Sequence, residues 1–252
     1  MSTFLPEPET TVLHERFASV LMRMEQATLA SGRKPEDIAL VAVSKKHPAS
    51  MIAALLAVWR KGQPAFGENY TQEALQKQAD VASLLATPNG NGLPEPAWHF
   101  IGHVQSRKAR DIAGRFTLIH TLDSEKLATA LCKAVAAVEL PPLATLVQIN
   151  IGREEQKAGV LPENAERLLQ AILPMRELCI EGLMCIPPFD SDSRPCFVAM
   201  RDLRDKLAQA TGLPLRQLSM GMSHDYEAAI AEGATIVRIG TDIFGPRPTQ
   251  QT

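Results

Sequence analysis

Lys45 is the side chain of this sequence best suited to covalent chemistry with a carbonyl compound. It follows a short apolar segment, residues 38–43, in alternation with Val41 and Val43. Side chains two positions apart on a strand point to the same face, so Lys45 shares the face of the two valines. If that face is enclosed, partial desolvation lowers the lysine pKa from about 10.4 and raises the fraction of neutral amine that a Schiff base needs. An isolated lysine at a strand end more often extends its ammonium group into water, so this signal alone does not decide.

Two turns rich in small residues near the end of the sequence are suited to phosphate. Residues 219–225 read Ser-Met-Gly-Met-Ser-His-Asp before an expected helix, and residues 238–245 contain Gly240 and Thr241. Small side chains allow the backbone to approach an anion, and the first turn of a helix offers free N–H groups at its positive dipole end. Ordinary tight turns with Ser and Asp as helix caps are the alternative. Two such turns after consecutive strands favour phosphate binding, with Ser223 in the first turn.

Four other polar or reactive residues are weaker candidates. His99 and His103 are four positions apart, which suits a metal only on a helix, and the pattern there predicts a strand running into a loop. Cys185 has no histidine in evident partnership and is expected in the core. Glu68 is either a general base or the structural partner of a lysine or arginine. We therefore predict no metal site and no catalytic residue among them.

Short apolar segments alternate with helical patterns along the whole sequence. Near-continuous apolar strands between helices are typical of a parallel sheet covered on both faces, and eight such units in 252 residues favour a closed barrel. The alternative, a Rossmann fold, lacks its G-x-G-x-x-G sequence after the first strand. The prediction is an α/β fold, a single (β/α)8 barrel of TIM type with an extra N-terminal helix. The expected strands are residues 38–43, 65–69, 98–103, 117–121, 145–150, 179–185, 218–223 and 234–238.

The barrel prediction places the candidate residues together. In such barrels the functional site lies on the loops at the carboxyl ends of the strands. Lys45, Asn69, Ser223 and Arg238, with residues 240–241, all stand at or just after expected strand ends. This shared position favours a ligand site at that end of the barrel.

Length, composition and charge restrict the remaining possibilities. Helical spacing of apolar residues begins at Val12, so we expect a flexible tail over residues 1–11, the barrel over 12–247 and a short tail over 248–252. A formal charge of −2 argues against a general nucleic-acid binder, and no apolar stretch approaches the ~20 residues that span a bilayer. Four cysteines without a C-x-x-C pair and an N-terminus without a signal-peptide pattern indicate reduced thiols and a cytoplasmic protein.

Six short motifs give this sequence a family resemblance. They occur in order over nearly the whole sequence, and together they resemble the pyridoxal phosphate homeostasis proteins. The two C-terminal motifs are the most specific. The motifs are Val-Ala-Val-Ser-Lys at 41–45, Phe-Gly-Glu-Asn at 66–69, Trp-His-Phe-Ile-Gly at 98–102, Gly-Leu-Met at 182–184, Ser-Met-Gly-Met-Ser-x-Asp at 219–225 and Arg-Ile-Gly-Thr at 238–241.

The resemblance implies a barrel like the N-terminal domain of alanine racemase, with pyridoxal 5′-phosphate (PLP) as its cofactor. Lys45 stands at the position of the family's linking lysine and would hold PLP as a Schiff base. A cationic arginine opposite the pyridine nitrogen, also implied, disfavours protonation of the ring and weakens its use as an electron sink. The other implied cofactor-binding residues are Asn69 in the wall of the site, Arg238 at the pyridine nitrogen, and Ser223, Gly240 and Thr241 at the phosphate.

The sequence departs from the family pattern at two places. Where the family usually has Gly-x-Leu-Gln-x-Asn-Lys, residues 102–108 read Gly-His-Val-Gln-Ser-Arg-Lys, so Arg107 adds a charge after the third strand. The loop at 87–96 is unusually long. Both would alter surface contacts or access to the cofactor, and neither includes a residue assigned to PLP.

Three functions are compatible with a carbonyl compound bound to a lysine in a barrel. They are a PLP carrier that buffers the cofactor or delivers it transiently to PLP-dependent apoenzymes, a PLP-dependent amino-acid racemase or lyase, and a Schiff-base aldolase. Alanine racemases add a β domain and a tyrosine base. Here only residues 245–252 follow Phe244, and the two tyrosines, Tyr70 and Tyr226, each open a predicted helix. We therefore expect a PLP-binding protein without robust turnover, and, in the absence of a second domain, a monomer.

Overall fold

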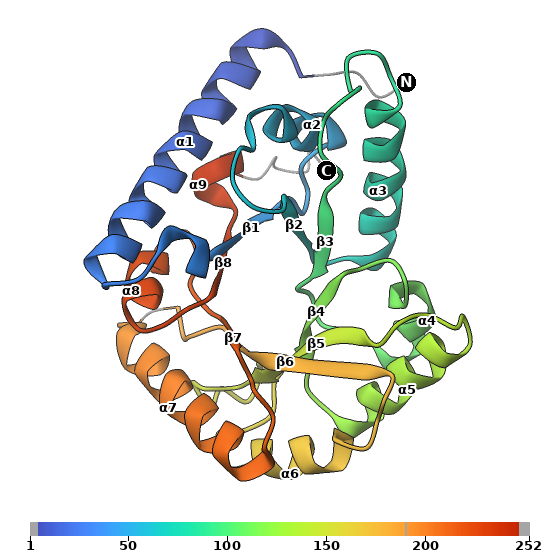
Figure 1. Ribbon diagram of the computed structural model, residues 1–252, viewed down its shortest axis with the longest axis vertical. Helices are drawn as coiled ribbons and strands as arrows, with labels where there is room; N and C mark the ends of the chain where they lie inside the picture. Colours follow the sequence, from blue (N-terminus) through green and yellow to red (C-terminus); the bar gives the residue numbers. More distant parts are fainter. Residues whose placement is uncertain (1–4, 190, 247–252) are drawn as a thin grey trace.

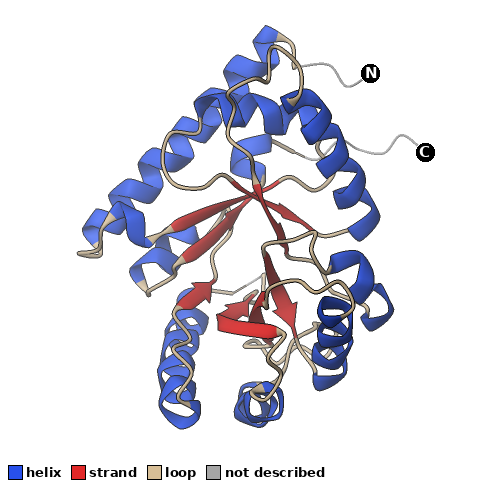
Figure 2. Cartoon of the chain, turned by 45° about the vertical axis from the view of Figure 1, so that its right-hand side comes forward, coloured by secondary structure: helices blue, strands red, loops and turns tan. Residues whose placement is uncertain are grey.

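Eight parallel strands form a closed barrel in which the strands pair in sequence order and β8 pairs with β1. The computed structural model describes residues 5–189 and 191–246. Figure 1 shows the strands around the centre of the molecule, and Figure 2 shows the helices outside them. The predicted (β/α)8 barrel is confirmed. The strands are β1 (Ala39–Val43), β2 (Ala65–Glu68), β3 (Ala97–Phe100), β4 (Leu118–Leu122), β5 (Leu143–Ile149), β6 (Leu178–Cys185), β7 (Gln217–Ser219) and β8 (Ile236–Ile239).

Helices alternate with the strands and cover their outer faces. The extra helix α1 precedes the barrel and contacts α2, α8 and α9. Within the described ranges, no helix is long and apolar enough to cross a membrane. The helices are α1 (Glu7–Ala30), α2 (Ala49–Val58), α3 (Thr71–Leu85), α4 (Ala109–Ile112), α5 (Glu125–Ala136), α6 (Pro162–Ile172), α7 (Arg194–Thr211), α8 (Tyr226–Ala231) and α9 (Thr241–Phe244), with 3₁₀ turns at Pro35–Asp37 and Ser106–Lys108.

The first helix begins earlier than the apolar pattern indicates. α1 starts at Glu7, directly after Pro6, with two glutamates in its first turn. Proline suits a helix start and acidic side chains there interact favourably with the helix dipole. This turn faces solvent, so the apolar spacing that begins at Val12 does not report it. Residues 7–11 are helical rather than part of a loose tail, which corrects the predicted boundary. The ends of the predicted tails, residues 1–4 and 247–252, lie outside the described residues.

Local signals explain several other element boundaries. Ser124 caps α5, because its Oγ accepts the backbone N–H of Leu127 at 3.3 Å. The strand expected at 218–223 ends earlier, at Ser219. It does not extend through Gly221, which has a φ of +93° and lies so close to the start of α8 that a Cβ would be 2.6 Å from the Ala229 Cβ.

Side chains on the strands alternate between the helices and the barrel interior. Leu40 and Ala42 pack outward in the main core, whereas the fully buried Val41 faces inward. The inward apolar residues form a separate cluster, mostly from the first residues of their strands. It fills the barrel interior beside the polar residues of the site, since Val41 pairs in register with Arg238 and Met184 with Ser219. The cluster comprises Val41, Ala65, Ala97, Leu118, Leu146, Met184 and Ile236.

Candidate functional site

Barrel closure brings the two ends of the chain together at the site. Because β8 pairs with β1, the strand ends at the mouth follow the order β7, β8, β1, β2. A Cβ on Gly240 would lie 3.4 Å from the Cβ and carbonyl oxygen of Val43, so the turn after β8 contacts the end of β1. His47 stacks on Phe244 with ring centres 5.0 Å apart, which joins the loop after Lys45 to α9. The turns that carry Lys45 and Gly240 are therefore neighbours.

Lys45 is the second residue beyond β1. Alternation from the interior residue Val41 places it on the inner face of the barrel, where it is half-buried. The next residue, Lys46, is exposed and has a φ of 65°. The two adjacent lysines thus differ in environment, and Lys45 is the one at the mouth.

Arg238 lies below the mouth in the barrel interior, only 3% exposed. Its Nη1 donates to Ser219 Oγ at 2.6 Å and its Nη2 to the carbonyl oxygen of Cys185 at 2.9 Å. Burial lowers the pKa of the guanidinium, but arginine keeps its charge in proteins. Among the ion pairs of the described residues, none involves Arg238, so its charge is held by neutral acceptors.

Two histidines continue this arrangement as a relay, defined here as Arg238, Ser219, His120 and His99. Ser219 Oγ lies 2.8 Å from His120 Nδ1, and His120 Nε2 lies 3.0 Å from His99 Nδ1. A guanidinium only donates, so the Ser219 hydroxyl oxygen accepts from Arg238, and its own proton is left to donate to His120 Nδ1. His120 is then protonated on Nε2 and donates to His99, which carries its proton on its other nitrogen.

Both histidines of the relay are neutral near pH 7. Burial lowers the pKa of His99 to about 4. Burial, then the charges of His99 and Arg238, lower the pKa of His120 well below its usual 6.5. The sequence patterns did not identify His120 or Ser219 as site residues. The only sequence feature that could have identified them is that each is a polar residue inside an apolar strand, His120 in β4 and Ser219 in β7.

The two predicted phosphate turns contact each other. The backbone N–H of Asp242 in α9 donates to Ser223 Oγ at 3.4 Å, and the N–H of Arg238 donates to the Gly221 carbonyl oxygen at 3.0 Å. Ser223 and Gly240 are half-buried, and Thr241 is exposed. These small residues therefore remain accessible beside the turn of Lys45.

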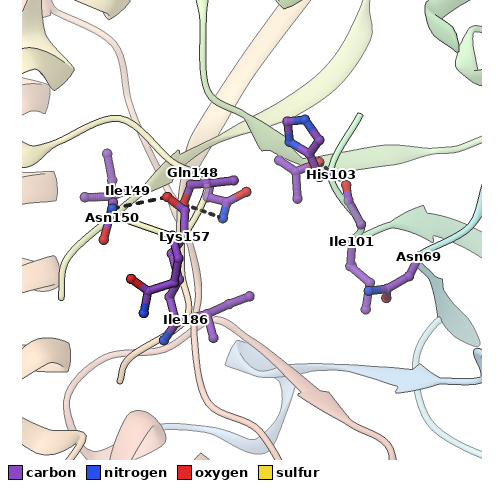
Figure 3. Close-up of a pocket in the computed structure, with 12 residues that line it drawn as sticks. Asn69, Ile101, His103, Gln148, Ile149, Asn150, Lys157 and Ile186 are labelled. Carbon is purple, nitrogen blue, oxygen red and sulfur yellow. Dashed lines mark hydrogen bonds between the residues drawn. The ribbon is translucent and has the colours of Figure 1, made fainter. Parts of the chain in front are cut away.

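A cavity of about 550 Å³ opens on the other side of the mouth, at the ends of β2 to β6 (Figure 3). Asn69 lines it, and Asn69 Oδ1 is buried without a hydrogen-bond partner. Gly102 packs against this residue so closely that a Cβ would lie 2.1 Å from the Asn69 carbonyl oxygen. Figure 3 shows Gln148 and Lys157 across the cavity from Asn69. Asn69 is the only predicted cofactor residue in the cavity lining.

The far wall of this cavity is held by hydrogen bonds that the sequence patterns did not reveal. Gln148 Nε2 donates to the Ala158 carbonyl oxygen at 3.0 Å. Lys157 Nζ donates to the Pro187 carbonyl oxygen at 3.1 Å and forms an ion pair with Glu154. The bond from Lys157 to Pro187 ties the loop after β5 to the loop after β6, and the other two hold β5 and its own loop together. A polar glutamine in the apolar strand β5 was the available sequence signal.

Two weaker sequence candidates lie outside the mouth. Glu68 is fully buried on the outer face of the barrel and accepts from Lys77 Nζ at 2.7 Å, so it is the structural partner of a lysine. Cys185 is fully buried, and burial raises the pKa of its thiol to about 12. It is a core residue, as expected.

Comparison with known proteins identifies the family. The alanine racemase N-terminal domain family matches residues 25–248. The pyridoxal phosphate homeostasis protein of Pseudomonas aeruginosa is 42% identical over 237 residues, which cover 94% of this chain and 96% of that protein. This chain belongs to the pyridoxal phosphate homeostasis proteins. The resemblance carried by its six motifs is thereby confirmed.

Solved structures agree with membership of the pyridoxal phosphate homeostasis family. PipY of Synechococcus elongatus PCC7942, solved with PLP bound, has a TM-score of 0.76 at 35% identity, covering 92% of this chain and 100% of that chain. Alanine racemase from Corynebacterium glutamicum has a TM-score of 0.64 at 17% identity, covering 93% of this chain and 63% of the racemase. The racemase therefore shares the barrel fold with this chain.

Proposed function

We propose that this chain binds PLP at the barrel mouth, covalently through Lys45, and buffers or delivers it without catalytic turnover of its own. One observation carries the proposal: β7, β8, β1 and β2 end side by side, with the buried Arg238 among them. When bound, PLP supplies an aldehyde that condenses with a lysine amine, with loss of water, to a Schiff base. Lys45 is half-buried in the turn after β1, beside the turn of Gly240.

Unsatisfied polar groups in the barrel fit the ring of PLP. Buried charges are normally paired, yet Arg238 contacts only neutral acceptors in the described part of the chain. A guanidinium only donates, so it suits an unprotonated pyridine nitrogen, which accepts. Asn69 Oδ1, buried and without a partner, leaves an acceptor for a donor group on a ligand. We assign Arg238 to the pyridine nitrogen and Asn69 to the wall of the PLP site.

The small-residue turns fit the phosphate. Ser223 offers a hydroxyl, and Gly240 and Thr241 begin α9, where backbone N–H groups point out of the helix. Because these turns lie beside the turn of Lys45, a ligand held by its phosphate would present its aldehyde to the lysine. We therefore assign Ser223, Gly240 and Thr241 to the phosphate.

The surroundings of both tyrosines favour a carrier over a racemase. Tyr226 is 1% exposed under Arg23, whose guanidinium carbon lies 5.1 Å from the ring centre, and burial raises its pKa to about 12. Tyr70 is 51% exposed and precedes α3. The burial of Tyr226 withholds it from acting as the base that racemisation needs opposite the lysine. A bound cofactor at this mouth is open to exchange, which suits transient delivery by a monomer to PLP-dependent apoenzymes.

Borohydride reduction tests the proposal. The protein mixed with PLP should show a yellow absorption band that borohydride abolishes, leaving a pyridoxyl group on Lys45 in peptide mass analysis. Lys45→Ala should lose the band, whereas the matched control Lys46→Ala should keep it. Amino-acid racemase and lyase assays should give no rate above background. A robust rate that Lys45→Ala abolishes would favour the enzyme over the carrier, and a protein that takes up no PLP would exclude both.

A further inference from the structure

A buried lysine cluster, defined here as Lys77, Glu68, Glu73 and Ser44, lies on the outer face of the barrel between β1, β2 and α3. Lys77 is 6% exposed, and Glu68 is fully buried. Lys77 Nζ lies 2.7 Å from Glu68 Oε1, 2.8 Å from Glu73 Oε1 and 2.7 Å from the Ser44 carbonyl oxygen. Ser44 Oγ donates to Glu68 Oε1 at 2.7 Å. Three acceptors meet the three protons of the ammonium group, so Lys77 is held as a cation.

This cluster forms hydrogen bonds with the residues on both sides of Lys45. Ser44 is bound twice, through its carbonyl oxygen to Lys77 and through its hydroxyl to Glu68. The backbone N–H of Lys46 donates to the Glu73 carboxylate. Lys46 has a φ of 65°, a left-handed conformation that a residue with a Cβ adopts only when its surroundings hold it. The contact with Glu73 supplies that restraint.

The conformation of Lys46 separates the two adjacent lysines. With the turn held, Lys45 is half-buried and Lys46 is exposed. Without the contact between Lys46 and Glu73, nothing in the cluster favours the left-handed conformation. The backbone would then return to the common negative-φ region, and the two side chains would exchange or share the mouth.

We propose that Lys77, with Glu68 and Glu73, is a positioning cluster that selects Lys45 over Lys46 as the lysine that binds the aldehyde of PLP. This inference rests on the proposed function. Lys77 contacts neither the mouth nor the cavity lining; it acts through the backbone of Ser44 and, by way of Glu73, of Lys46.

Site-resolved labelling tests the selection. The protein is mixed with limiting PLP, reduced with borohydride and cleaved after glutamate, so that residues 37–68 form one peptide in which fragmentation separates a label on Lys45 from one on Lys46. In Lys77→Met and in Glu73→Ala, the ratio of label on Lys46 to label on Lys45 should rise by roughly tenfold, the effect of losing one hydrogen bond to a charged group. Glu73→Gln, which keeps an acceptor oxygen, should retain the wild-type ratio.

The variants separate this role from a general effect on folding. Glu73 is 30% exposed, so Glu73→Ala leaves no fully buried charge without a partner even if Lys77→Met fails to fold. A folded Glu73→Ala protein, judged by circular dichroism, that labels Lys45 with the wild-type ratio overturns the selection while leaving the proposed function intact. A wild-type protein that carries no pyridoxyl group on either lysine refutes the proposed function instead. Acetylation of the PLP-free protein gives an independent measure, since the Lys46-to-Lys45 reactivity ratio should change in Glu73→Ala and not in Glu73→Gln.

Discussion

Removing the Ser219 hydroxyl should destabilise the protein far more than its size suggests. Ser219 is fully buried and lies between two polar partners, 2.6 Å from Arg238 Nη1 and 2.8 Å from His120 Nδ1. In Ser219→Ala both partners lose a hydrogen bond in the barrel interior, beside its apolar cluster. Each buried group left unsatisfied costs about 1–3 kcal/mol, so we expect a loss of about 3 kcal/mol in the free energy of unfolding.

Urea and thermal unfolding of the PLP-free protein, followed by circular dichroism, measure this loss. For a chain of this size, about 3 kcal/mol corresponds to a fall in Tm of roughly 6–12 °C. Ser83→Ala is the matched control. It removes the same hydroxyl from the exposed face of α3, where Ser83 bonds the Ala79 carbonyl oxygen at 2.9 Å, and it should change stability by no more than about 0.5 kcal/mol.

A double-mutant cycle asks whether the relay acts as a unit. If Ser219 and His120 are coupled, Ser219→Ala in a His120→Phe background should cost about 1–2 kcal/mol less than in the wild type. An effect of Ser219→Ala as small as that of Ser83→Ala, or strict additivity with His120→Phe, would show that the relay does not act as a unit.

Three further outcomes follow from the described contacts. The pKa of His99 is about 4 in the folded protein and about 6.5 in the unfolded chain, so the unfolded chain binds more protons between these pH values. The contribution of His99 to the free energy of unfolding should therefore be complete above pH 6.5 and fall as the pH drops towards 4. Urea titrations at several pH values should show a flatter dependence on pH for His99→Asn than for the wild type. Gly102→Ala should displace Asn69 and raise the Kd for PLP, measured by absorption titration, by roughly tenfold, the equivalent of one hydrogen bond. A thiol reagent at pH 8 should modify the exposed Cys179 in the native protein. It should modify Cys185 only after unfolding, because Cys185 is buried and its pKa is raised to about 12. Modification of Cys185 in the native protein at the same rate as Cys179 would contradict its burial.

The barrel wall carries two buried cations in opposite circumstances. Lys77 is surrounded by the carboxylates of Glu68 and Glu73, so its charge is compensated within the protein and its role is structural. Arg238 has a serine and a carbonyl oxygen but no ion pair among the described residues. The Asp225 carboxylate interacts with this charge without forming an ion pair, so Arg238 keeps weaker compensation than Lys77 has. The contrast supports a binding role for Arg238 and a positioning role for Lys77.

Local sequence patterns were sufficient for the architecture. Apolar strands alternating with helices identified the barrel, because the spacing of apolar residues within a strand or helix depends only on residues that are close in sequence. Alternation along β1 also predicted that Val41 faces the barrel interior, where the structure places it. The cap at Ser124 was likewise readable, since its hydrogen-bond partner is three residues away.

Contacts between distant segments required the folded chain. The turn of Gly240 touches Val43 only because β8 closes on β1, and Ser219 meets His120 across the barrel, 99 residues away. The partner of Glu68 could not be chosen from the sequence, since several lysines and arginines were available, and packing of α3 on the strands selected Lys77. Strand and helix periods record which face a residue occupies, whereas the partner that it meets there depends on closure and register, which are properties of the whole barrel.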